Sequence, residues 1–248
     1  MTSRCRAPLA GVAFVSCSLL SCIANGSLIV SASGSGFGSP GLKSAEVEFA
    51  VSGNNLLVTL TNTGPNDVLV PADVFTAVFF DVSGPSLALT PVSGYLAGGS
   101  VVYYDPDGQP PGGDIGGEWA YRSGINNGPT SASYGISSVG LDIFGPGDLF
   151  PGANLAGPAS PDGLQYGLLP ASDDPATGNG GITGSGGLIN NSVVMTLSGL
   201  PDDFDLGRIG NVYFLYGTSI DEGGFTPTPG AAVLAGVAAI ALGLRRRR

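Results

Sequence analysis

Short apolar stretches with a two-residue alternation, separated by glycine, proline and asparagine, are the feature that most restricts the fold of this chain. Residues 45–51 place Ala, Val and Phe at every second position, and residues 56–60 resume an alternation after the turn Ser-Gly-Asn-Asn. Successive side chains of a strand point to opposite faces, so each stretch predicts a half-buried β-strand. The turn between them predicts a β-hairpin.

A second kind of stretch is apolar at nearly every position. Residues 74–80 read VFTAVFF, which is typical of a central strand covered on both faces. Further β segments are expected at residues 87–92, 100–104, 118–121, 164–168, and at the strand pair 192–200 and 210–216. These short strands, with no amphipathic helix and no fixed-period repeat, predict an all-β domain, a β-sandwich or a jelly-roll-like fold.

Glycine and proline are abundant, with 42 and 19 residues of 248. Such a share approaches the composition of disordered chains, but the alternating strands argue for a folded domain. Long Gly/Pro-rich loops are expected at residues 105–117, 145–163 and 171–187, at one or both ends of the domain. The domain itself is expected to span residues 27–225, hereafter the body.

The first 26 residues predict an export signal. Two arginines precede an apolar stretch over residues 9–23, and Ala-Asn-Gly supplies small residues before Ser27. This order is that of a secretory signal peptide, so the secretion machinery and signal peptidase are expected partners. An alternative is a lipoprotein signal, because residues 19–22 loosely resemble a lipobox in which Cys22 would be acylated.

The last 23 residues, 226–248, hereafter the tail, predict a membrane segment. Residues 231–244 carry no charge and would span only about 21 Å as a helix, which is short of a hydrocarbon core about 30 Å thick. The arginines that end the chain are expected to stay on the cytoplasmic side, leaving the body outside. Two prolines separate this segment from the body. The tail residues of interest are Pro227, Thr228, Pro229, Gly230, Arg245, Arg246, Arg247 and Arg248.

This tripartite tail resembles the bacterial PEP-CTERM sorting signal, in which a Pro-Glu-Pro motif precedes a short transmembrane helix and an arginine cluster. Thr228 stands where that family usually has glutamate. The resemblance implies an exosortase as partner, a membrane-embedded cysteine transpeptidase that cuts near the motif. A permanent single-span anchor is the alternative, and the short apolar run favours cleavage over it.

The body also resembles a group of exosortase-dependent surface proteins of unknown molecular function. The similarity lies at residues 51–56, 69–74, 117–121, 144–148 and 160–167. It implies a location at the cell surface rather than a chemistry.

The charge of the body excludes several functions. Apart from the two ends, only Lys43, Arg122 and Arg208 oppose all 19 acidic residues, a formal net charge of −16. Such a surface repels nucleic acid, which is bound through lysine and arginine. The chain has no histidine, and its three cysteines all precede residue 23. Disulfides, Cys/His zinc sites, thiol nucleophiles and a Ser-His-Asp triad are therefore not expected in the body, nor is a cofactor or an enzymatic activity.

Three acidic residues form the first candidate site. Asp105 and Asp107 alternate beside a glycine, with Asp114 nearby, as carboxylates do in calcium loops. The register lacks the next ligand position and a closing glutamate, so an ordinary acidic turn without metal is the expectation. Asp173 and Asp174 are interpreted as solvated loop acids.

Glu118 with Trp119 and Tyr121 forms the second candidate site. A carboxylate beside aromatic rings suits a sugar-binding patch. A buried core anchor is the expected role of Trp119, however, because tryptophan buries a large apolar area.

Two classes of function remain. The first is a structural or adhesive protein of the cell envelope or extracellular matrix, exported, sorted at the tail, and in contact with exopolysaccharide. The second is a polysaccharide- or ice-binding module. Thr59 and Thr61, two positions apart, give the only hint of the threonine row that ice binding would need.

Overall fold

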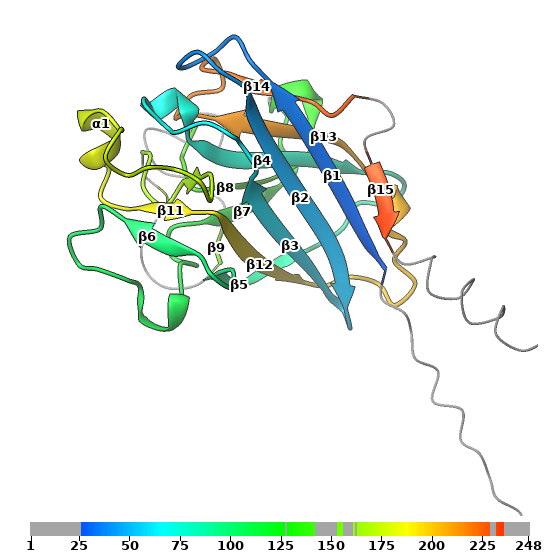
Figure 1. The fold of residues 1–248 in the computed structure, drawn as a ribbon. Coiled ribbons are helices and arrows are strands. Elements are labelled where there is room, and N and C mark those ends of the chain that lie inside the picture. The colour runs from blue at the N-terminus through cyan, green and yellow to red at the C-terminus, as the bar shows by residue number, and fades with distance from the viewer. Residues whose placement is uncertain are drawn as a thin grey trace, which may run out of the picture.

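The computed structural model describes residues 26–126, 128–141, 153–155, 161, 163–228 and 232–235. Within these ranges the chain is mostly β-structure in two sheets that share one hydrophobic core (Figure 1). The prediction of an all-β chain is confirmed at this level. The predicted signal peptide, with Cys22, lies outside the described residues apart from Gly26, and so do Pro229, Gly230 and residues 236–248.

Sheet A has six described strands in the order β15-β1-β2-β3-β12-β5. Their bounds are β1 Ser27–Gly34, β2 Lys43–Ser52, β3 Asn55–Asn62, β5 Thr90–Leu96, β12 Ser192–Ser198 and β15 Ala232–Ala235. Every neighbouring pair is antiparallel. Figure 1 shows the long strands of this sheet running steeply across β4 and β13 of the second sheet.

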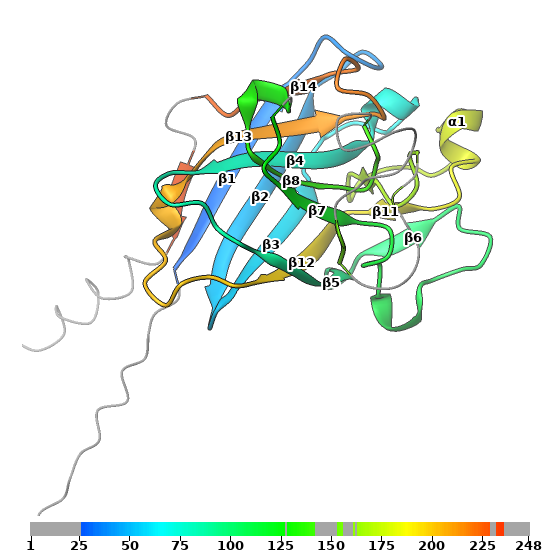
Figure 2. The same ribbon diagram turned by 180° about the vertical axis from the view of Figure 1, so that it is seen from behind.

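Sheet B has nine described strands, seven of them in the order β6-β11-β10-β4-β8-β7-β9, with β13 and β14 on the other side of β4. Figure 2 shows this sheet from behind. The strands are β4 Phe75–Val82, β6 Val101–Tyr103, β7 Ala120–Ser123, β8 Tyr134–Ser137, β9 Ala153–Asn154, β10 Leu168–Leu169, β11 Leu188–Asn190, β13 Ile209–Tyr216 and β14 Gly224–Phe225. The helical turns are η1 Pro71–Asp73, η2 Pro111–Gly113, η3 Pro129–Ser131, η4 Leu206–Arg208 and α1 Gly180–Thr183.

The predicted hairpin is confirmed as β2 and β3. Its two strands pair from Ala45↔Asn62 to Ser52↔Asn55, and Gly53 takes the positive φ of 60° that the tight turn needs. In both strands the apolar residues of the alternation are buried, except Val51 near the end of β2, while the residues between them are at most partly covered. The alternation in the sequence therefore corresponds to the inner and outer faces of sheet A.

The predicted central strand is confirmed as β4. Its residues from Phe75 to Phe80 are all buried, because apolar clusters cover both faces of the strand. Phe75, Val78 and Phe80 belong to the core shared with sheet A, and the ring of Phe80 lies 5.1 Å from that of Phe49 in β2. Ala77 and Phe79 pack in a smaller outer cluster with Ala120 of β7, Leu215 of β13 and loop residues on either side of β8.

The structure corrects several predicted segments. The expected strand pair 192–200 and 210–216 forms β12 and β13, but these strands lie in different sheets: β12 pairs with β3 and β5, and β13 with β4 and β14. The acidic break after β12 is a crossing between sheets rather than a hairpin. The segment at 87–92 is displaced to β5, and only Leu168 of the segment 164–168 lies in β10. The strands not predicted are β1, β8, β9, β11, β14 and β15.

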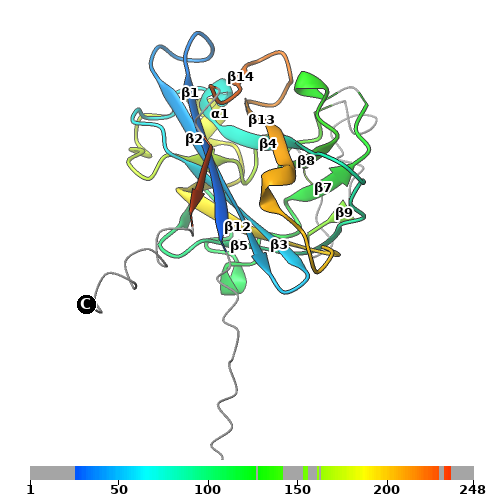
Figure 3. The same cartoon turned by 90° about the vertical axis from the view of Figure 1, so that its right-hand side faces the viewer.

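The two described ends of the chain lie side by side. Ser27 at the start of β1 is paired with Ala235 at the end of β15, as Figure 3 shows at the near edge of the molecule. Of the expected tail helix, 231–244, the structure describes only Ala232–Ala235, and these residues form a strand because the edge of β1 offers hydrogen-bonding partners. Among the described residues, no helix is long and apolar enough to cross a membrane.

A buried ion pair joins sheet A to the segment that leads into β4. Lys43 Nζ lies 3.0 Å from Asp73 Oδ1, and both side chains are almost fully buried. Asp73 also accepts hydrogen bonds from Ser39 N at 2.8 Å, Ser39 Oγ at 2.6 Å, and the backbone N–H groups of Leu69 and Val70, each at 3.1 Å. Burial alone would raise the pKa of Asp73, but these hydrogen bonds and Lys43 lower it below its ordinary value. Gly38 is required here, because a Cβ would collide with the Asp73 carboxylate.

We expect Asp73→Ala to lower the free energy of unfolding by about 3–5 kcal/mol at neutral pH, because it leaves the Lys43 ammonium buried without its partner. The native pKa of Asp73 is lowered, so its stabilisation is fully present above the unfolded value, about pH 4, and is lost as pH falls through the native value. Urea unfolding across this pH range should show the difference from wild type shrinking in acid. The double variant Lys43→Met, Asp73→Ala should cost less than the sum of the single variants. A cost below about 1 kcal/mol for Asp73→Ala, as for an exposed pair, would contradict this assignment.

Candidate ligand groove

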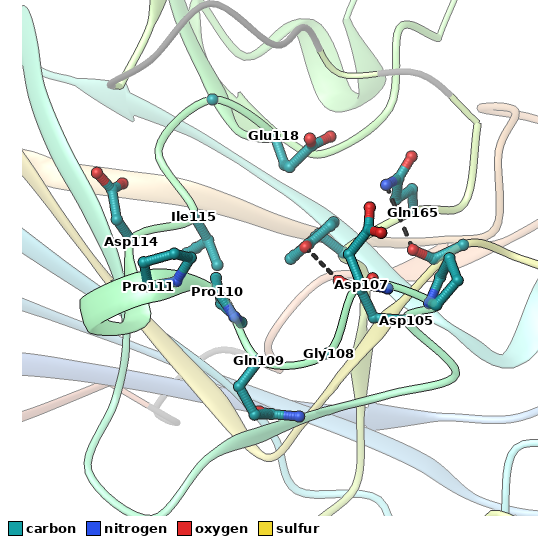
Figure 4. Close-up of a pocket in the computed structure, with 14 residues that line it drawn as sticks. Asp105, Asp107, Gly108, Gln109, Pro110, Pro111, Asp114, Ile115, Glu118 and Gln165 are labelled. Atoms are coloured by element: carbon teal, nitrogen blue, oxygen red, sulfur yellow. Dashed lines mark hydrogen bonds between the residues drawn. The ribbon is translucent and has the colours of Figure 1, made fainter.

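An acidic groove with a volume of about 580 Å³ lies beside β6. It is built from the loop that follows β6, the segment that precedes β7, and the turn that precedes β10 (Figure 4). Its polar side chains come from Asp105, Asp107, Gln109, Asp114, Glu118, Gln165 and Tyr166, and its apolar ones from Pro106, Pro110, Pro111 and Ile115. The structure thus brings both acidic candidate sites of the sequence to one hollow.

Asp105 anchors one wall of the acidic groove. Its Oδ1 accepts a hydrogen bond from Asp107 N at 2.8 Å, and its Oδ2 accepts one from Tyr166 Oη at 2.7 Å. Burial raises the pKa of Tyr166, and the hydrogen bond to Asp105 and the nearby carboxylates raise it further. Tyr166 therefore keeps its proton and serves as a fixed donor that orients Asp105. The carboxylate of Asp107 points into the hollow (Figure 4).

Gln109 holds the same loop against β6. Its side-chain amide makes two hydrogen bonds to the backbone of Val102, accepting from N at 2.8 Å and donating to O at 2.7 Å. The amide thus replaces the strand neighbour that this part of β6 lacks. Together with the Asp105 contacts, it gives a Gly/Pro-rich loop a defined shape.

The opposite wall is tied to the edge of sheet A. Ile115 N donates to Gly94 O at 2.9 Å, and Asp114 forms an isolated bridge with Tyr95 of β5. Asp114 Oδ1 accepts from Gly116 N at 3.0 Å. The backbone of β5 thus holds this wall in place.

The residues of the predicted sugar-binding patch do not lie on one surface, because some of them are buried. Glu118 lines the acidic groove, whereas Trp119 has no exposed surface and Tyr121 is buried. The expectation that Trp119 is a core anchor is confirmed. Neither ring can therefore stack on a ligand in the acidic groove.

The three candidate calcium ligands do not converge. Both oxygens of Asp105 already accept hydrogen bonds, and Asp114 lies across the hollow from Asp105 and Asp107 (Figure 4). Among the described residues, no group of three or more acidic, cysteine or histidine side chains is placed to hold a metal ion.

The charge of the acidic groove restricts its ligand. Four carboxylates line it, and none of its described lining residues is lysine or arginine. Carboxylates and the Gln165 amide accept or donate hydrogen bonds to hydroxyl groups, and the prolines offer apolar contact. The arrangement suits a neutral, hydroxyl-rich ligand or a cation, and it repels phosphate and other anions.

Sequence reasoning did not include Gln165 and Tyr166 in the site. Tyr166 lies 61 residues from Asp105 in the chain, and no local pattern indicates that they meet.

The interpretation of Asp173 as a solvated loop acid is wrong. It is only 6% exposed, accepts from Val68 N at 2.7 Å, and burial followed by the charges of Asp67 and Asp174 raises its pKa.

The described residues of the tail motif are accessible. Thr226 and Thr228 are exposed, Pro227 is half-buried, and all three lie outside regular secondary structure. Pro229, Gly230 and the four terminal arginines lie outside the described residues.

Comparisons with known proteins leave the fold and the acidic groove as the basis for assigning a function. No protein-family model, curated protein or solved structure matches this chain.

We expect calcium to leave the stability of the protein unchanged. At about 10 mM, a site as weak as those of extracellular modules, with Kd about 1 mM, would still add more than 1 kcal/mol and raise the Tm by about 2–4 °C. Thermal unfolding with calcium and with EGTA should differ by less than this. A rise in Tm with calcium that Asp107→Asn abolishes would show that the carboxylates converge on a cation.

Proposed function

We propose that this chain is an exported protein of the cell envelope or extracellular matrix, with a structural or adhesive body and a PEP-CTERM-type tail that an exosortase-like enzyme reads. The observation that carries the proposal is that the body begins with β1 at Ser27 and ends at Phe225, whose ring lies against Gly34 at the other end of the same strand. Both ends of the body therefore lie along the β1 edge of sheet A, where an export signal and a membrane segment would approach the same membrane surface.

The body fits this role in two further respects. We assign its architecture as a β-sandwich, supported by two sheets that bury Phe49 and Phe80 against each other. The acidic groove lies on the side of β6, away from β1 and β15 in both views of the molecule (Figures 1 and 2). A body held at its β1 edge would therefore present the acidic groove outward.

The tail is proposed to be processed rather than kept. Thr226 and Thr228 are exposed and the backbone between them is irregular, as a protease substrate requires, because a processing enzyme must bind the chain in an extended form. The alternatives are a plain anchor, in which the whole tail persists, and a lipoprotein acylated at Cys22.

We expect protein at the cell surface to lack the residues that follow about Pro229, and Pro227→Ala, Pro229→Ala protein to accumulate uncut in the cytoplasmic membrane. Intact-mass analysis of both fractions measures this. Thr226→Ala is the matched control, because it lies beside the motif and leaves the prolines in place. Wild-type surface protein that still carries Arg248, in a cell with an active exosortase, would show a permanent anchor. A mass that includes a lipid on Cys22 would support the lipoprotein alternative.

A polysaccharide-binding function is the second candidate, and the acidic groove favours it. Its carboxylates would accept hydrogen bonds from sugar hydroxyls, and its prolines would offer apolar contact to the face of a sugar. Ice binding has less support, because the strand neighbours of Thr59 are Glu48 and Val194, so no row of threonines extends across sheet A.

We expect the protein to bind neutral oligosaccharides on a glycan array and not to bind sulfated or phosphorylated ones. Asp107→Asn and Glu118→Gln should each weaken binding about tenfold, the effect of losing a charge-assisted hydrogen bond worth roughly 1.5 kcal/mol. Asp203→Asn, in the exposed turn after β12, is the control and should have no effect. Unchanged affinity in both groove variants would exclude the acidic groove as the binding site.

A further inference from the structure

The two edges of sheet A are built differently. The β5 edge carries Pro91, and its pairing with β12 is irregular between Thr196 and Leu197. Its outer side is also occupied, because Ile115 N donates to Gly94 O at 2.9 Å. Proline, irregular pairing and a covering loop are devices by which proteins prevent an edge strand from pairing with another chain.

The β1 edge has none of these devices in its own sequence. Its eight residues, SLIVSASG, include no proline and no charge, and they pair with β2 without interruption from Ser27 to Gly34. The strand is therefore long, regular and able to accept a partner over its whole length. An edge of this kind is a template for a further strand.

The cover of the β1 edge comes from the tail. Ala232–Ala235 pairs with β1 from Ser27 to Val30 only. Beyond that, Thr226 and Thr228 face Ser31 and Ser33 across a hollow of about 250 Å³. The tail is brought to this edge by Phe225, whose ring approaches so closely that a Cβ on Gly34 would lie 2.7 Å from it. β15 thus pairs with the first half of β1, and residues 225–228 lie beside the second half.

This cover is conditional. The four residues of β15 belong to the segment that the proposed function sends into the membrane or removes by cleavage, and they cannot be a strand on β1 at the same time. Once they leave, the outward N–H and C=O groups of Ser27–Val30 lose their partners. The same event that sorts the protein therefore exposes a pairing edge.

We propose that this bared β1 edge is a self-association surface, through which two copies of the body pair β1 to β1 in antiparallel orientation. A two-fold axis makes such a contact self-complementary and closed. The copies are acidic, but β1 is uncharged, and the nearest carboxylates on the outer face, Glu46 and Glu48, lie on β2. The β2 strands of two copies would be three strand spacings apart, about 14 Å, which exceeds a screening length of about 8 Å at physiological ionic strength.

The test removes the cover in vitro, so it does not depend on whether a cell processes the tail. A site for a specific protease is placed between Thr228 and Ala232 in the full chain, and the mass in solution is measured by light scattering before and after cutting. The uncut chain should be monomeric, and the cut chain, freed of the residues that follow the cut, should form a dimer of twice its own mass. Ile29→Lys, which puts a charge into the new contact, should keep the cut chain monomeric. Val92→Lys, at an exposed position of β5, should leave the dimer intact.

A reversible disulfide between β1 and β15 tests whether the dimer forms through the β1 edge or through another surface. Ile29 and Val233 are directly opposite, so cysteines at these positions, with Cys5, Cys17 and Cys22 replaced by serine, should hold β15 on β1 after cutting. The locked chain should stay monomeric until a reductant is added, and then dimerise.

A cut chain that stays monomeric, or a locked chain that dimerises without reductant, would overturn the proposal. A cut chain that rebinds a synthetic peptide of residues 226–240 but does not dimerise would overturn it too, because the edge would then accept only its own tail. Uncut protein at the cell surface would contradict the processing step alone and leave these outcomes unchanged.

Discussion

The burial of β4 on both faces is the constraint on which the rest of the structure depends. A strand without a polar face must be covered twice. Sheet A covers one side, and a smaller cluster from β7, β13 and the loops on either side of β8 covers the other. The backbone of β4 is satisfied by β13 along one edge and by β8 and β10 along the other. Sheet A has no such demand, and its outer face carries Glu46, Glu48 and Thr59.

The segment leading into β4 shows how charge is used in so apolar an interior. Asp73 lies two residues before the strand and gathers one ammonium and four hydrogen-bond donors. The pair stabilises the particular path from β3 to β4, because any other path would leave these groups unsatisfied. In the acidic groove, the Tyr166–Asp105 hydrogen bond does the same for the loop that follows β6.

Local order was predictable from the sequence, and long-range order was not. The alternation at 45–60 and the apolar run at 74–80 identify β2, β3 and β4, because side-chain direction and burial are properties of a single strand. The partner of β12 is β3, more than a hundred residues earlier in the chain, and an acidic turn gives no sign that β13 joins the other sheet. The sequence identifies the acids of the acidic groove separately, as acids in loops: Asp105, Asp107, Asp114 and Glu118. It does not predict their assembly into one site, in which Tyr166 fixes Asp105 by a hydrogen bond.

The pairing of distant strands also has a consequence in time. β3 needs β12, so sheet A lacks this partner until the chain is complete to about residue 198. The central strand needs β13 beside it, so sheet B cannot close until about residue 216. Contacts of such long range make folding slow. If a chain of this kind passed through a narrow channel N-terminus first, most of it would therefore still be unfolded during the passage. The body would then fold only after nearly all of it had reached the far side.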